Sequence, residues 1–227
     1  MRILLSAIIL TFIAIGGGCK RAPAAVEKPH NATPKDALLS LLHAMKDANP
    51  DEVMAACKAP PEQRPIIDAG SNYTREVYKF RDAFIAAYGA DAWDTFQDPA
   101  HRPGDHDTTF IIITDESLDK ATKTAFEIDG DKATCNMPEG SGKVQLVKMP
   151  NGQWLADGST FVPPGKTVEE LRQTLDKLTA TVKKYEKAIG KPNIGPSDID
   201  YELGREINFL ISGITDTSRH RFEIDKL

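Results

Sequence analysis

A short loop-like segment, residues 101–107, carries the densest group of side chains that could bind a metal ion. Two imidazoles and two carboxylates could act as ligands: His101, Asp105, His106 and Asp107. Such groups bind zinc and other divalent cations. However, the spacing matches no standard site, and Arg102 would oppose a bound cation. Proline and glycine are typical of loops, so the segment is either a metal site or a solvated polar loop.

Four further residues could take part in proton transfer inside a cavity: Tyr78, Tyr88, Asp115 and Asp157. This chemistry pairs a carboxylate or histidine with a polarising hydroxyl. None of the four lies in a known catalytic motif, and the two tyrosines recur at helical spacing, as core aromatics do. His43 has apolar neighbours and is more typical of a packed or surface histidine. Without a phosphate loop, a GxSxG elbow or a Cys/His nucleophile pattern, the sequence assigns no catalytic residue and no cofactor.

The first nineteen residues have the pattern of an export signal. Arg2 is followed by an apolar run, Ile3–Ile15, and then by three glycines before Cys19. A basic start, an apolar stretch and small residues before a cleavage site are typical of secretory signals. Residues 1–18 are therefore predicted to be a signal peptide.

The residues around Cys19 resemble the lipobox of bacterial lipoproteins. Gly17 and Gly18 fit the two positions before the cysteine, whereas Gly16 stands where an aliphatic residue is usual. The resemblance implies that the Cys19 thiol receives a lipid and becomes the mature amino terminus. The protein would then be exported and held at a bacterial membrane in the cell envelope. Ordinary export, or an uncleaved anchor of minimal spanning length, are the alternatives.

A tether is predicted to follow the lipidated cysteine, over residues 19–33. The stretch contains Pro23, Pro29 and several alanines and has no hydrophobic periodicity. Asn31 matches the glycosylation acceptor pattern, with Ala32 and Thr33 after it. In a bacterial lipoprotein that match would be accidental.

The net charge argues against nucleic acid or anionic lipid as a partner. The whole chain has 28 basic and 33 acidic residues, a net charge of −5. Removal of residues 1–18 takes away only Arg2, which leaves −6. Such a chain is not attracted to nucleic acid or anionic lipid by its net field.

Two cysteines remain beyond Cys19, at Cys57 and Cys135. In an oxidising compartment two cysteines can form a disulfide. The alternative is a pair of buried free thiols, because sequence alone does not show whether the two Cα atoms approach.

Helix signals dominate the first half of the chain and strand signals the middle. Thr33-Pro34 and Asn49-Pro50 are typical helix starts, and a longer helix is expected over 71–88. Five short strands are expected after it: 109–114, 121–128, 132–137, 143–148 and 153–157. The Asp129-Gly130 step is a strong hairpin signal. The order predicts an α+β fold, with N-terminal helices packed on a curved antiparallel meander sheet.

The order of these elements resembles the nuclear-transport-factor-like, or cystatin-like, superfamily. The resemblance covers roughly residues 34–160 and includes a last strand of the Gly-x-Trp type, Gly152-Gln153-Trp154. It implies a cavity between the sheet and the helices that could hold a small ligand. Members include isomerases, dehydratases and non-catalytic binding modules, so the fold does not select a function.

A C-terminal helical hairpin is predicted within residues 161–227. One helix has an unbroken heptad spacing from Val168 to Ile189, and a second begins near Ser197. The heptad face either packs on its own chain or binds a second copy or another protein.

The sequence therefore predicts an envelope lipoprotein that displays a non-catalytic binding module for a small ligand or a protein. A cavity enzyme with lyase-type or isomerase-type chemistry is one alternative. An assembly protein that acts through the heptad helix is another.

Overall fold

The computed structural model describes residues 31–98, 110, 112–137 and 142–212, which belong to two compact units. Unit 1 combines the chain up to Thr74 with Ile111–Arg172, and unit 2 combines Arg75–Phe110 with the chain from Gln173 onward. Among the described residues, 75–98 and 110 belong with the C-terminal helices in unit 2.

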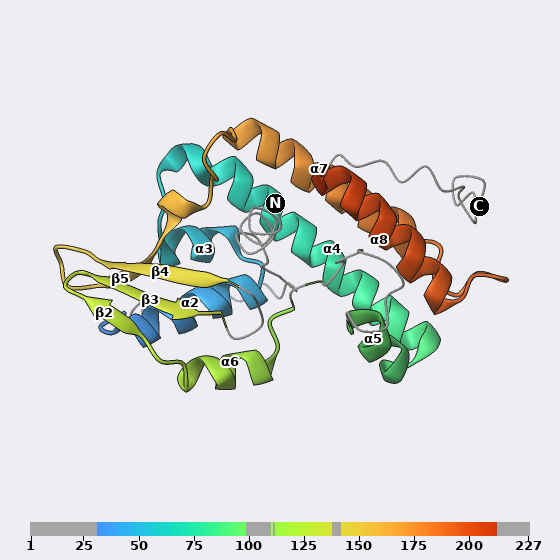
Figure 1. Cartoon of the computed structure of the whole chain (residues 1–227), viewed down its shortest axis with the longest axis horizontal. Helices are drawn as coiled ribbons and strands as arrows, with labels where there is room; N and C mark the ends of the chain where they lie inside the picture. The colour runs from blue at the N-terminus through green and yellow to red at the C-terminus, as the bar shows by residue number, and fades with distance from the viewer. Residues whose placement is uncertain (1–30, 99–109, 111, 138–141, 213–227) are drawn as a thin grey trace, which may run out of the picture. The chain divides into compact units, whose positions relative to one another are not determined.

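Unit 1 contains the sheet and most of the short helices (Figure 1). Its helices are α2 (Pro34–Lys46), α3 (Pro50–Ala56), η1 (Pro61–Gln63), α6 (Asp115–Thr122) and η3 (Gly158–Thr160). Its strands are β1 (Cys57–Lys58), β2 (Glu127–Asp129), β3 (Lys132–Asn136), β4 (Lys143–Lys148) and β5 (Trp154–Asp157). Helices α5 (Ala90–Gln97) and α8 (Pro196–Ser212) belong to unit 2. Two long helices, α4 (Arg64–Tyr88) and α7 (Val168–Glu186), contribute to both units. The predicted α+β class, with helices before and after a sheet, is confirmed.

The sheet has the order β1-β5-β4-β3-β2. Strands β2 to β5 form the predicted antiparallel meander. The hairpin signal is also confirmed, since Gly130 has a φ of 58° between β2 and β3. Strand β1 was not predicted. It pairs in parallel with β5, so the sheet is mixed.

Two of the predicted strands are wrong over part of their length. Ala121 and Thr122, where the strand 121–128 was expected to begin, are the last residues of α6, and only Glu127–Asp129 forms β2. Thr114 accepts a hydrogen bond from the backbone of Ser117, whose side chain accepts one in return, and this capping box starts the helix. Phe110 and residues 112–114 are in no strand, and residues 109 and 111 lie outside the described part.

One row of residues across the sheet combines three small side chains with one leucine. Cys57 pairs with Ala156, which lies opposite Leu146, which in turn lies opposite Ala133, so the four share a face. All four are buried. Helix α2 contacts β4 and β5 and buries its apolar stripe (Figure 1). That stripe contains Leu38, Leu41, Leu42 and Met45.

Unit 2 is built around a cluster of aromatic rings from α4, α5 and the segment after α5. Phe80 is fully buried, and its ring centroid lies 5.8 Å from those of Phe84 and Phe96. Trp93 and Phe110 complete the cluster. Helix α8 returns along α7 (Figure 1), as the predicted hairpin requires.

The heptad face of α7 is buried within this single chain. The buried positions that belong to unit 2 are Leu175, Leu178, Val182 and Tyr185. Internal packing of this face, one of the two predicted interpretations, accounts for their burial.

We expect Gly158→Ala to destabilise unit 1 by about 1–3 kcal/mol. An added Cβ would lie 2.7 Å from Ala59 Cβ and 2.9 Å from Lys58 O, so the backbone would have to move. Ser159→Ala, at an exposed neighbour, is the matched control and should change stability by less than about 0.5 kcal/mol. Thermal or urea unfolding measures both, and equal stability of the two variants would contradict this close approach.

Candidate functional site

The structure places Asp115 in a surface ion pair at the start of α6. Its carboxylate accepts a hydrogen bond from Lys46 Nζ, at the end of α2. That bond lowers the pKa of Asp115, and the charges of Lys46 and then His43 lower it further. His43 is exposed. An exposed carboxylate held ionised by a lysine is poorly suited to act as a general base near neutral pH, so this pair is a contact between α2 and α6.

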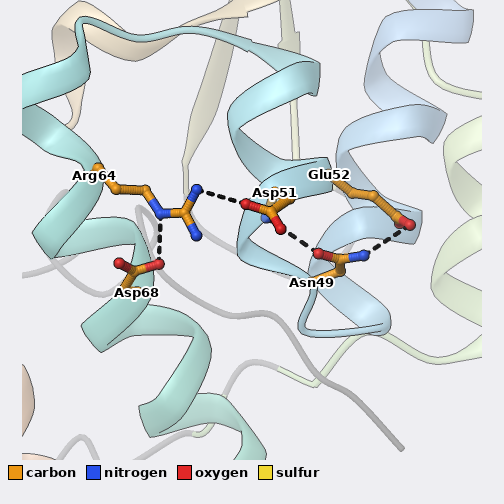
Figure 2. Close-up of polar contacts among 5 residues, drawn as sticks. All are labelled: Asn49, Asp51, Glu52, Arg64 and Asp68. Atoms are coloured by element: carbon orange, nitrogen blue, oxygen red, sulfur yellow. Dashed lines mark hydrogen bonds and ion pairs between the residues drawn. The ribbon is translucent and has the colours of Figure 1, made fainter. Parts of the chain in front are cut away.

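A second surface network joins α3 to α4 (Figure 2). Arg64 donates from Nη1 to Asp51 and from Nε to Asp68, both at 2.6 Å. These two carboxylates raise the pKa of the guanidinium. Asn49 caps α3 by accepting from the Asp51 backbone, and it donates to Glu52 at 2.9 Å. The three acids are exposed and Asn49 and Arg64 are half-buried, so the network contributes little stability. The Arg64 guanidinium bridges Asp51 and Asp68.

Cys57 and Cys135 lie in the core of unit 1 as free thiols. They are on β1 and β3, which are separated by β5 and β4. Three strand spacings correspond to about 14 Å, whereas a disulfide needs Cα atoms about 4.4–6.8 Å apart. The structure therefore has the buried free thiols and not the disulfide. Burial raises the pKa of Cys57 to about 12 and that of Cys135 to about 11.

These thiols should resist alkylation in the folded protein. In a Cys19→Ser variant we expect slow labelling by iodoacetamide at neutral pH and labelling of both thiols after unfolding in urea. The labelling rate of the folded protein should rise with pH, because the reactive thiolate forms only near the raised pKa values. Mass spectrometry counts the labels. Fast labelling of either thiol at neutral pH in the folded protein would contradict this placement.

The acid–base candidates are divided between the two units. Asp115 and Asp157 belong to unit 1, and Tyr78 and Tyr88 belong to unit 2. Asp157 accepts from Ser159 N at 3.0 Å and caps η3. Tyr78 stacks under the Arg81 guanidinium, 6.0 Å from the ring centroid. Each of the residues is thus engaged in a local structural contact.

Tyr88 holds the loop between α7 and α8. Its hydroxyl donates to Ile194 O at 2.9 Å and accepts from Gly190 N at 3.0 Å. Its ring packs edge-on against Phe84, with centroids 5.0 Å apart. The hydroxyl thus both donates to and accepts from the backbone of the loop, so Tyr88 stabilises the loop conformation.

We expect Tyr88→Phe to destabilise unit 2 by about 1–2 kcal/mol, because two hydrogen bonds are lost while the ring stays. Tyr88→Leu also removes the ring contact and should cost more. Chemical unfolding followed by circular dichroism measures the difference. A Tyr88→Phe variant as stable as the wild type would show that these bonds contribute nothing.

Sequence reasoning missed the buried carboxylates of unit 2. Glu76 is 4% exposed and pairs with Lys79 Nζ at 2.8 Å and Lys183 Nζ at 3.7 Å. Glu202 is 2% exposed and pairs with Arg205 at 3.0 Å. The sequence shows the i,i+3 spacing of Glu76 with Lys79 and of Glu202 with Arg205. It does not show that the two glutamates are buried.

The partly buried Glu206 links α8 to α7. Its carboxylate accepts from Tyr185 Oη at 3.0 Å and from Lys184 Nζ at 3.2 Å. Burial raises the pKa of the Tyr185 phenol, and the negative charge of Glu206 raises it further. The phenol therefore stays protonated and keeps donating. These paired charges join helices and form no open acid–base site.

Two hydrogen bonds of Asn31 hold the first described residue to the fold, and the sequence did not predict these bonds. Its backbone oxygen accepts from Trp154 N at 2.8 Å, and its Oδ1 accepts from Ser40 Oγ at 2.7 Å. The residue is 6% exposed. A buried, hydrogen-bonded amide is a poor glycan acceptor, which agrees with an accidental match to the glycosylation pattern. Residues 31–33, the last three of the predicted tether range 19–33, are therefore part of the fold, and Thr33 caps α2.

The remaining predicted site residues lie outside the described part of the chain. These are Cys19 and the metal-ligand group His101, Asp105, His106 and Asp107. Among the residues that are described, no three histidine, cysteine or acidic side chains are grouped to hold a metal ion. Within that same part, no helix is both long and apolar enough to cross a bilayer.

Comparison of the chain with family models, curated proteins and solved structures gives no significant match. Any function must therefore be argued from the residues themselves.

Proposed function

We propose that this chain is an exported bacterial lipoprotein of the cell envelope that displays a non-catalytic binding domain. The observation that carries the proposal is the segment Met1–Cys19, with its basic start, apolar run and small residues directly before a cysteine. Lipid on Cys19 would hold the protein at the membrane. Several acyl chains together anchor a protein stably, whereas one chain does so only marginally.

The described contacts support a binding function over a catalytic one. The candidate acids and hydroxyls of the sequence each serve a local contact: Asp115 with Lys46, Asp157 at η3 and Tyr88 at its loop. The two core thiols are buried with raised pKa values. A nucleophile or general base needs the opposite situation, an accessible group with a suitable pKa.

The cystatin-like resemblance supplies the proposed form of this binding domain. Unit 1 has one helix packed on a meander sheet, which is compatible with that class. A small ligand or another protein is the proposed occupant. Turnover that is abolished by a single carboxylate substitution would overturn the non-catalytic part of the proposal.

Lipidation is tested by feeding radiolabelled fatty acid to a bacterial host that expresses the full chain. We expect label in the wild type and none in Cys19→Ser, because that substitution removes the acylated thiol. Cys57→Ala is the matched control, since it removes a different cysteine and should keep the label. Gly16→Leu restores the usual aliphatic residue of the lipobox and should be labelled at least as well as the wild type. Equal labelling of the wild type and Cys19→Ser would end the proposal.

A further inference from the structure

Strand β2 forms an open edge of the sheet in unit 1 (Figure 1). It comes last in the strand order, and β3 is its one partner among the described residues. All three of its residues are exposed, and Ile128 is 60% exposed although its side chain is large and apolar. In a single copy of the chain this edge therefore faces solvent.

The free backbone groups of this edge belong to Ile128. Asp131 O accepts from Lys148 N at 2.8 Å, so Asp131 and every second residue after it bond toward β4. Successive residues of a strand direct their N–H and C=O groups to opposite sides, so the residues in between, Lys132 and Thr134, bond toward β2. The residues of β2 opposite them bond back. The N–H and C=O of Ile128 point the other way, where a further strand could pair with them.

The side chains of β2 alternate between an apolar face and an acidic face. Ile128 lies opposite the buried Ala133, and Glu127 and Asp129 project from the other face of the strand. A strand that pairs with this edge should therefore place basic residues beside the two acids. A second β2 does not, because antiparallel pairing about Ile128 would put Glu127 opposite Asp129, and like charges directly opposite destabilise a sheet.

The carboxyl-terminal stretch of this chain has the required pattern in its sequence. Fifteen residues, 213–227, follow α8 and lie outside the described part. Residues 219–221 are Arg-His-Arg, two cations separated by one residue. Residues 222–225 are Phe-Glu-Ile-Asp and repeat the sequence of residues 126–129. This stretch therefore has the same alternation of apolar and charged residues as β2 and adds basic residues before it.

We propose that the β2 edge of one copy binds residues 219–222 of a second copy as an added antiparallel strand. In the matching register Arg219 lies opposite Asp129 and Arg221 lies opposite Glu127, so both charge pairs have opposite signs. The phenylalanines at 126 and 222 meet on the other face. Opposite charges and aromatic pairs directly across two strands stabilise a sheet.

A second copy is the occupant because the edge is exposed when one copy is present alone. Each copy has one β2 edge and one carboxyl-terminal segment, so two copies can exchange segments and close a twofold dimer. The two contacts reinforce each other, since the first makes the second intramolecular. The pairing needs no lipid on Cys19 and is independent of the proposed function.

The test measures the association of chains that lack residues 1–19 by sedimentation velocity. These chains keep every described residue and the carboxyl-terminal segment. The edge variant is Glu127→Lys with Asp129→Lys, and the segment variant is Arg219→Glu with Arg221→Glu. Circular dichroism checks that both variants are folded.

We expect the wild type to dimerise and each variant alone to associate at least about tenfold more weakly, because four charge pairs per dimer change from attractive to repulsive. An equimolar mixture of the edge and segment variants should dimerise as the wild type does, since each then meets complementary charges. Glu62→Lys with Asp94→Lys makes the same change of net charge at two exposed acids outside β2 and should leave the dimer intact. Added salt should weaken the wild-type dimer, because it screens exposed charges.

A cross-link tests the register. In Ile128→Cys with His220→Cys the two thiols would lie directly opposite, with Cα atoms about 5.5 Å apart, which suits a disulfide. Mild oxidation should link two copies several-fold faster than in Ile128→Cys with Arg219→Cys, whose second thiol would lie on the other face.

A monomeric wild type, a dimer that the edge variant leaves unchanged, a mixture that stays dissociated or a cross-link within one copy would each overturn the proposal. These outcomes concern β2 and residues 219–222 alone. Failure of fatty-acid labelling would overturn only the proposed function.

Discussion

The packing of α2 on the sheet is the contact on which unit 1 depends. The facing row of the sheet is made of small residues around one leucine, Leu146. Small side chains let the backbone of a helix approach a sheet closely, and α2, whose leucines are buried, contacts the strands of Leu146 and Ala156. Burial of each such leucine contributes about 1.5–3 kcal/mol. Because Asn31 and the Thr33 cap precede α2, and Lys46 ends it, the same contact also positions Asn31 and the lysine that pairs with Asp115.

Unit 2 is stabilised in a different way. Its centre is a cluster of rings around Phe80, and its helices carry paired charges at nearly buried positions. A buried charge whose partner is removed costs about 3–5 kcal/mol. The rings therefore supply the apolar burial, while Glu76 and Glu206, whose partners lie on α7, restrict which helix faces can meet. These charge pairs join α7 to α4 and to α8, and the heptad residues of α7 in unit 2 are buried within the single chain.

The sequence predicted those elements whose signals are local. The caps at Thr33 and Asn49, the Asp-Gly hairpin and the strands from 132 onward depend on neighbouring residues, and the structure has them. The prediction failed where the local structure depends on a partner that is distant in the chain. Strand β1 has two residues and exists only because β5 lies beside it. The distance between Cys57 and Cys135 likewise depends on the order of strands in the sheet, which no local pattern contains. The hydrogen bonds of Asn31 to Trp154 and Ser40 also join residues that are distant in the chain.

The order of strands in the sheet also limits the reactions of Cys57 and Cys135, because it keeps the two thiols apart and buried. The chain has three cysteines, and two of them lie buried on β1 and β3 in the core of unit 1. Their raised pKa values keep both thiols protonated at neutral pH, and their burial keeps reagents out. Neither of these two thiols is therefore available as a nucleophile in the folded chain. Sheet order thus leaves Cys57 and Cys135 a single role, that of filling space in the core of unit 1.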